Sequence, residues 1–149
     1  HVTGGPLDAV SRDRLVSSPV RDMVRHLGRI EADPVTGLSG REQILRRMRG
    51  ADVLLLLHGT EPICAEYIPS KLYEYLWMQR PILATVHENA QMADLLRAQG
   101  HAVVEDVESV AATLEQMMNT WRLHRLPDNG QASPFTTQVA ARQLRESVA

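Results

Sequence analysis

Apolar residues along the chain alternate between short continuous runs and segments with a helical period. The longest run, within 51–57, is bounded by Gly50 and Gly59, and 81–86 and 101–104 are further runs of the same kind. Such runs are typical of parallel strands that are covered on both faces, and we expect 51–57 to be a central strand. Strands alternating with helical segments predict a doubly wound, Rossmann-like α/β fold, with a parallel sheet and helices on both faces.

Capping signals predict where two of the helices begin. Ser39 and Glu42 have the spacing of a capping box, and Gly50 stands where a glycine commonly follows the end of a helix. Asp106 precedes a long apolar stripe that reaches Trp121, and we expect it to be an N-cap. The sequence also predicts helices at 8–16, 70–79, 88–99 and 135–147, and strands at 1–3 and 23–27.

Length and composition are those of an ordinary globular domain. The 149 residues include 44% hydrophobic and 23% charged residues, which is enough apolar material for a core without disulfides or metal. We therefore predict a single domain over 1–149, with a loop and terminal helix at 127–149 that packs on a separate N-terminal domain. Since the chain opens at His1 rather than Met, we expect it to belong to a longer protein.

Charge and cysteine content argue against several classes of function. The formal net charge is −2 and no long basic block occurs, so we expect no nucleic-acid partner. Cys64 is the only cysteine, which precludes an internal disulfide, and the histidines show no zinc-site spacing. The run 53–57 is far shorter than the roughly 20 residues that span a bilayer. We expect a cytoplasmic protein with no transmembrane segment.

Polar residues with suitable chemistry follow the strand at 51–57, where ligands of open α/β sheets bind. A helix that opens at Ser70 offers its first amides to an anion, and the Lys71 ammonium adds positive potential, which suits a diphosphate. Glu74 lies one turn beyond Ser70, where its carboxylate can accept hydrogen bonds from vicinal ribose hydroxyls. Glu66 precedes the helix, in a position to reach a sugar beyond the diphosphate.

This segment resembles the Glu-x7-Glu region of retaining GT-B glycosyltransferases of the group 1 type. Seven residues separate Glu66 from Glu74, and the variant Pro-Ser-Lys-Leu-Tyr-Glu-Tyr-Leu is followed by Arg-Pro-Ile-Leu. The resemblance extends from about Val24 through Trp121. It implies that the chain is the C-terminal, donor-binding half of a GT-B glycosyltransferase.

The resemblance also implies a role for individual residues. Glu74 would bind the donor ribose, Glu66 would contact the transferred sugar as the catalytic residue of this domain, and Arg29 and Ile30 would contact the nucleobase. The implied donor is a UDP- or GDP-linked sugar, and no cofactor or metal is implied. The acceptor, a glycan, a lipid or another molecule, would be held by the N-terminal domain. We therefore expect this segment alone to be inactive, and the full-length protein to be cytoplasmic or peripheral to the membrane.

Two alternatives compete with this interpretation. A nucleotide-sugar 2-epimerase of the same architecture is the nearest enzymatic alternative. The other is a non-enzymatic interaction module, for example one like a receiver domain, although the apolar strand continues into His58 and Gly59 instead of into acidic residues. His58 receives no predicted role because the sequence shows no partner for it, and we expect Cys64 to be an inert, small side chain.

Overall fold

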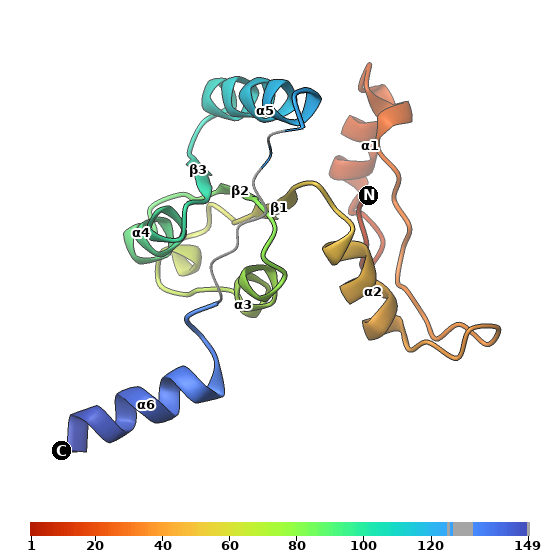
Figure 1. Cartoon of the computed structure of the whole chain (residues 1–149). Helices are drawn as coiled ribbons and strands as arrows, with labels where there is room; N and C mark the ends of the chain where they lie inside the picture. The colour runs from red at the N-terminus through yellow and green to blue at the C-terminus, as the bar shows by residue number, and fades with distance from the viewer. Residues whose placement is uncertain (125, 127–132, 149) are drawn as a thin grey trace. The chain divides into compact units, whose positions relative to one another are not determined.

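The computed structural model describes residues 1–124, 126 and 133–148 (Figure 1). The chain divides into two compact units, His1–Arg47 and Met48–Ala149. The single domain expected over 1–149 stays a prediction. Among the described residues, none of the helices combines the length and the apolar composition that crossing a bilayer requires.

The first unit begins with a short backbone pairing and a capped helix. Helix α1 (Ala9–Ser17) starts as predicted, because the Asp8 carboxylate accepts a 2.9 Å hydrogen bond from the amide of Ser11. Val2 and His26 form a parallel bridge, in which the amide of Val2 donates to the carbonyl of Arg25 over 2.8 Å. No side chain of this unit is buried.

The predicted strands at 1–3 and 23–27 are therefore reduced to this single bridge. The 3-10 helix η1 (Arg21–Met23) takes up the first residue of the second predicted strand. Gly28, whose carbonyl accepts a further 2.9 Å hydrogen bond from the amide of Gly4, has a φ of 67°, a backbone conformation that glycine adopts without steric cost. An isolated pair of strands is at best marginally stable, and in this unit only the segments around Val2 and His26 pair. The pairing is therefore not extended into a longer ladder.

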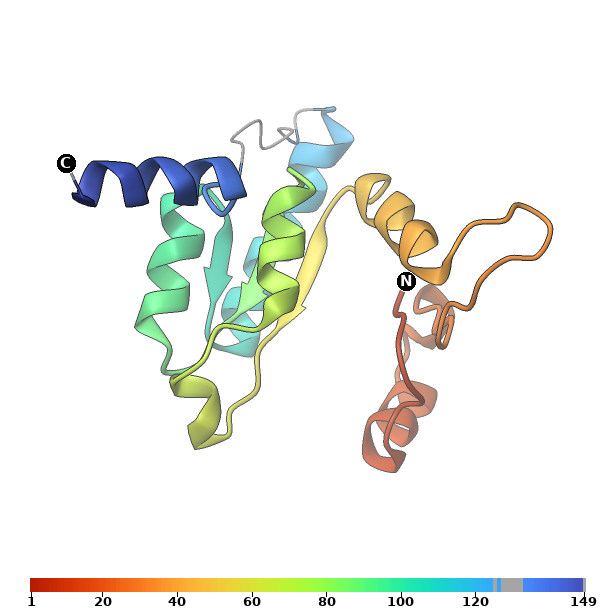
Figure 2. The same ribbon diagram turned by 90° about the horizontal axis from the view of Figure 1, so that it is seen from below.

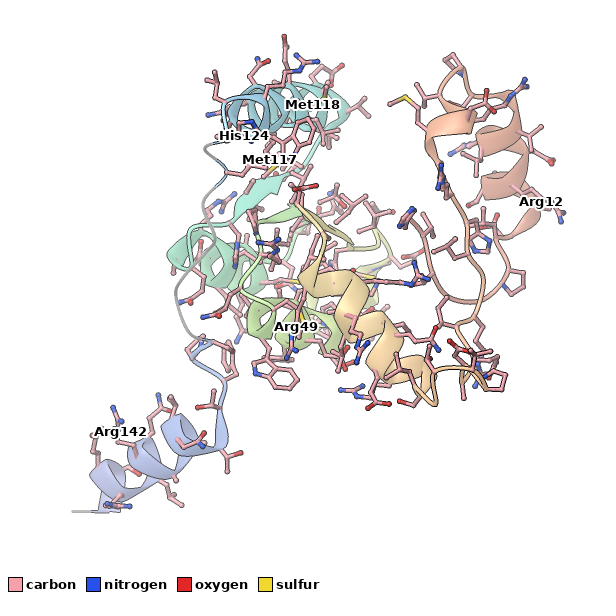
Figure 3. The ribbon with its side chains drawn as sticks, turned by 45° about the vertical axis from the view of Figure 1, so that its right-hand side comes forward. Arg12, Arg49, Met117, Met118, His124 and Arg142 are labelled. Carbon is pink, nitrogen blue, oxygen red and sulfur yellow. The ribbon has the colours of Figure 1, made fainter. Side chains whose placement is uncertain are left out.

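Helix α2 (Gly40–Arg49) has the predicted capping box. The amide of Ser39 donates to the Glu42 carboxylate over 2.8 Å, and the amide of Glu42 donates to the Ser39 hydroxyl over 3.2 Å. The helix ends at Arg49, which is exposed (Figure 3). Gly50 directly follows the end of the helix, as predicted, and does not adopt a positive φ there.

The second unit contains a three-stranded parallel sheet. Its strands are β1 (Leu54–Leu57), β2 (Ile82–Thr85) and β3 (Ala102–Val104), in the order β1-β2-β3. In their registers Leu54 pairs with Ile82, and Leu83 pairs with Ala102. The predicted α/β class with a parallel sheet is thus confirmed.

Helices lie on both faces of this sheet (Figure 2). Helices α3 (Ser70–Trp77) and α4 (Ala90–Ala98) cover one face, and α5 (Val107–Arg122) lies on the other. Two successive right-handed crossovers that advance in the same direction place their helices on the same side. The largest fully buried side chains of the core are Leu56, Leu72, Ile82, Leu83, Met92 and Leu96.

Strand β1 differs from its prediction as a central strand covered on both faces. It lies at the edge of the three-stranded sheet, and its side chains alternate between buried and exposed. Leu56 is 1% exposed whereas Leu57 is 66% exposed. The face that receives α3 and α4 is packed, whereas Leu55 and Leu57, on the other face of β1, are 50% and 66% exposed.

Helix α5 begins at its predicted cap, with the Asp106 carboxylate accepting a 2.7 Å hydrogen bond from the amide of Ser109. None of its residues is buried, although its apolar stripe predicts burial. Met117 and Met118 lie on this helix (Figure 3), and Met118 is half exposed.

The C-terminal segment lies partly outside the described residues. Of the loop expected at the start of 127–149, residues 127–132 lie outside the described residues. The predicted terminal helix is present as α6 (Thr137–Val148). Before it, the ring of Phe135 packs edge-on against Tyr73 of α3, with 4.9 Å between the ring centroids. This contact attaches the start of the segment to the helix of the candidate site.

Candidate functional site

The candidate site is built around the loop that leaves the carboxyl end of β1. The amide of His58 donates to the carbonyl of Thr85 over 3.1 Å, which extends the pairing with β2 by one residue. The loop then forms the 3-10 helix η2 (Pro62–Ala65) and enters α3 at Ser70. The loop thus stands at the edge of the sheet where ligands of open α/β folds bind.

Asn89, which precedes α4, secures this loop. Its side-chain nitrogen donates to the carbonyls of Cys64 over 2.9 Å and Tyr67 over 3.0 Å. Its side-chain oxygen accepts a 2.9 Å hydrogen bond from the amide of Met92 and so caps α4. Asn89 is 4% exposed, and its side chain therefore joins the loop after β1 to the helix after β2 inside the protein. The sequence analysis did not single it out.

Glu66 lies in the secured part of the loop. Its amide donates to the carbonyl of Ile63 over 3.2 Å, which closes η2. Its side chain is exposed, four residues before the first residue of α3. Glu66 is therefore accessible to a ligand at the carboxyl end of β1.

Ser70, Lys71 and Glu74 all belong to α3, as predicted. The N-cap of the helix is Pro69, which forms no side-chain cap, so the first amides of α3 receive no hydrogen bond from the side chain of their N-cap residue. Ser70 and Lys71 are exposed and Glu74 is half-buried one turn further on. The Lys71 ammonium lies 6.0 Å from the centre of the Tyr75 ring, a cation–π contact along the helix.

Arg29 and Ile30 belong to the first unit. The Arg29 guanidinium pairs with the Glu31 carboxylate at 3.2 Å, and both side chains are largely exposed. The side chain of Gln43 donates to the carbonyl of Glu31 over 2.8 Å, which ties this segment to α2. The contact of Arg29 and Ile30 with a nucleobase stays a prediction.

His58 is a buried group that the sequence analysis left without a role. It is 8% exposed, and neither ring nitrogen has a hydrogen-bond partner among the residues that the structure describes. Its ring lies against that of Tyr67, with 5.5 Å between the centroids. A signal was present in the sequence: His58 follows Leu54 and Leu56 at the period of two that places side chains on the same face of a strand.

Two tyrosine hydroxyls beside these residues stay protonated at neutral pH. The charge of the neighbouring Cys64, with burial as a smaller cause, raises the pKa of Tyr67 above its ordinary value of 10.0. Burial, followed by the charge of Glu74, raises the pKa of Tyr75. Both hydroxyls can therefore act as hydrogen-bond donors, and that of Tyr75 lies 3.4 Å from the carbonyl of Leu55.

Within the described ranges, no group of three His, Cys, Asp or Glu side chains is arranged to hold a metal ion. Comparison with protein-family models, with curated proteins and with solved structures found no match. The proposed function therefore rests on the residues of the loop after β1 and of α3.

Proposed function

We propose that this chain is the donor-binding domain of a GT-B glycosyltransferase, which transfers a sugar from a nucleoside diphosphate-sugar to an acceptor held by a separate N-terminal domain. The observation that carries the proposal is the start of α3, where amides without a side-chain cap lie beside Lys71 and one turn before Glu74. Helix N-termini favour anions because their free amides and the helix dipole point toward the ligand.

Each residue of the candidate site would bind a different part of the donor. The amides of Ser70 and Lys71 would bind the diphosphate, and the Lys71 ammonium would add positive charge. The Glu74 carboxylate would accept hydrogen bonds from the ribose hydroxyls, and charge-assisted bonds of this kind contribute about 1.5–3 kcal/mol each. Glu66, exposed on the loop before the helix, would contact the sugar.

In the reaction, the bond between the anomeric carbon and the diphosphate oxygen breaks and its electron pair goes to the diphosphate. The oxygen of an acceptor hydroxyl then forms the new glycosidic bond, with retention of configuration, and the hydroxyl proton goes to the departing diphosphate. Negative charge accumulates on the departing diphosphate, so the groups at the start of α3 stabilise the transition state more than the bound donor.

Titration calorimetry with UDP, GDP, ADP and TDP tests donor binding. We expect one of them to bind with a Kd between about 1 µM and 1 mM. Glu74→Ala should weaken that binding about 10- to 100-fold, since it removes one or two charge-assisted hydrogen bonds. Glu115→Ala removes the same charge from an exposed position on α5 and should leave the Kd unchanged. A folded protein that binds none of the four would overturn the proposal.

Product analysis with the full-length protein separates the transferase from an epimerase of the same architecture. A transferase releases the nucleoside diphosphate and forms a glycosylated acceptor. An epimerase leaves the acceptor unchanged and inverts a centre of the sugar. Formation of the epimer without acceptor glycosylation would exclude the transferase.

A further inference from the structure

His58 occupies a position where the fold favours an apolar residue. Leu54 and Leu56 point to the packed face of β1, and His58 is the next residue on that face. A leucine at this position would continue the core, whereas the imidazole places two polar nitrogens out of contact with water and without a partner. A buried polar group without a hydrogen bond destabilises the folded state.

The surroundings of His58 point to a ligand and not to the core. The residue stands at the carboxyl end of β1, and its own amide is fixed by the bond to Thr85. Its ring neighbour Tyr67 is 46% exposed and directly follows Glu66 in the loop. A single aromatic side chain that reaches solvent therefore lies against the buried imidazole.

We propose that His58 is a ligand-contacting residue, whose imidazole donates a hydrogen bond to an oxygen of the diphosphate-linked sugar when the Tyr67 side chain turns aside. The inference rests on the proposed function and deepens it. Either neutral tautomer of histidine carries one N–H, so the ring can donate to a phosphate oxygen or a sugar hydroxyl. The Asn89 side chain holds the backbone of Tyr67. The Tyr67 side chain can therefore rotate away from His58 without displacing the loop.

The inference predicts that binding and stability respond in opposite directions to one substitution. His58→Leu removes the unpartnered nitrogens and continues the pattern of Leu54 and Leu56, so its Tm should equal or exceed that of the wild type. The ligand for this test is the sugar-linked form of the nucleoside diphosphate that binds the wild type. The Kd of His58→Leu for this ligand should rise about 10-fold, as expected when one hydrogen bond to a charged group is lost. His58→Phe, which keeps a ring, should show the same pair of effects.

His101→Leu is the matched control. His101 is another buried histidine of the same unit, 9% exposed, but it stands at the start of β3 and away from the carboxyl edge. We expect this substitution to leave the Kd unchanged.

Modification by diethyl pyrocarbonate tests the role of Tyr67 as the cover. His58 should react slowly in the wild type and faster in Tyr67→Ala, and saturating donor should protect it in that variant. Equal rates in the two proteins would overturn this role.

The outcomes separate this inference from the proposed function. If the wild type binds a nucleoside diphosphate-sugar and both His58 variants bind it equally well, the inference is wrong and the donor-site proposal stands. If the His58 variants are markedly less stable than the wild type, the imidazole is a structural group and the inference is wrong. If the folded wild type binds none of the donors, both proposals fail.

Discussion

The side-chain nitrogen of Asn89 lies 3.0 Å from the carbonyl oxygen of Tyr67, which is 22 residues earlier in the chain. Asn89 also bonds the carbonyl of Cys64 and caps α4. A side chain that follows β2 thereby fixes the backbone of the loop that follows β1. Glu66 lies between the two bonded residues, so its position at the candidate site depends on this connection.

Asn89→Ala should destabilise the second unit by about 3 kcal/mol. The substitution removes an N-cap, which contributes about 1 kcal/mol, and it leaves two loop carbonyls without a donor. Urea unfolding followed by circular dichroism measures the change. The same variant should bind nucleoside diphosphates more weakly, because the loop before α3 loses its anchor.

Asp106→Ala provides the comparison. It removes the cap of α5, which is bonded to the amide of Ser109, but no contact with the loop. We expect a loss of about 1 kcal/mol and an unchanged Kd. Equal destabilisation by the two substitutions would show that the bonds from Asn89 to the loop contribute nothing measurable.

Features that depend on neighbouring residues could be predicted from the sequence. The capping box of Ser39 and Glu42 and the cap formed by Asp106 are both present, because these bonds join residues three positions apart. The start of α3 at Ser70 is also as predicted, since proline fixes the backbone just before it.

Features that depend on distant segments could not be predicted. An apolar run such as 54–57 is compatible with burial on one face or on two, and the crossovers decide that α3 and α4 lie on the same side. The role of Asn89 likewise arises from contacts with residues more than twenty positions away in the chain. The sequence predicts which residues follow β1, but only the fold determines which of them become buried.

Leu56→Ala and Leu57→Ala should differ sharply in their effect on stability. Leu56 is fully buried between the sheet and its helices, and its truncation should lower the free energy of unfolding by about 3 kcal/mol. Leu57 is mostly exposed, and its truncation should change the free energy by less than about 0.5 kcal/mol. Chemical denaturation of the two variants measures both values. A similar, large loss in Leu57→Ala would show that the second face of β1 is covered, as the apolar run alone predicts.

His101 should make stability fall as the solution is acidified below about pH 6.5. Burial lowers the pKa of its imidazole from the ordinary value of 6.5, so the folded state keeps it neutral at a pH where the unfolded chain takes up a proton. The unfolded state then binds more protons, and the free energy of unfolding decreases with falling pH. The slope approaches about 1.4 kcal/mol per pH unit for one proton between the two pKa values and vanishes below the lower one.

Unfolding in urea at a series of pH values should show a shallower dependence of the free energy of unfolding on pH for His101→Gln than for the wild type. Parallel curves for the wild type and His101→Gln would mean that folding does not alter the protonation of this residue.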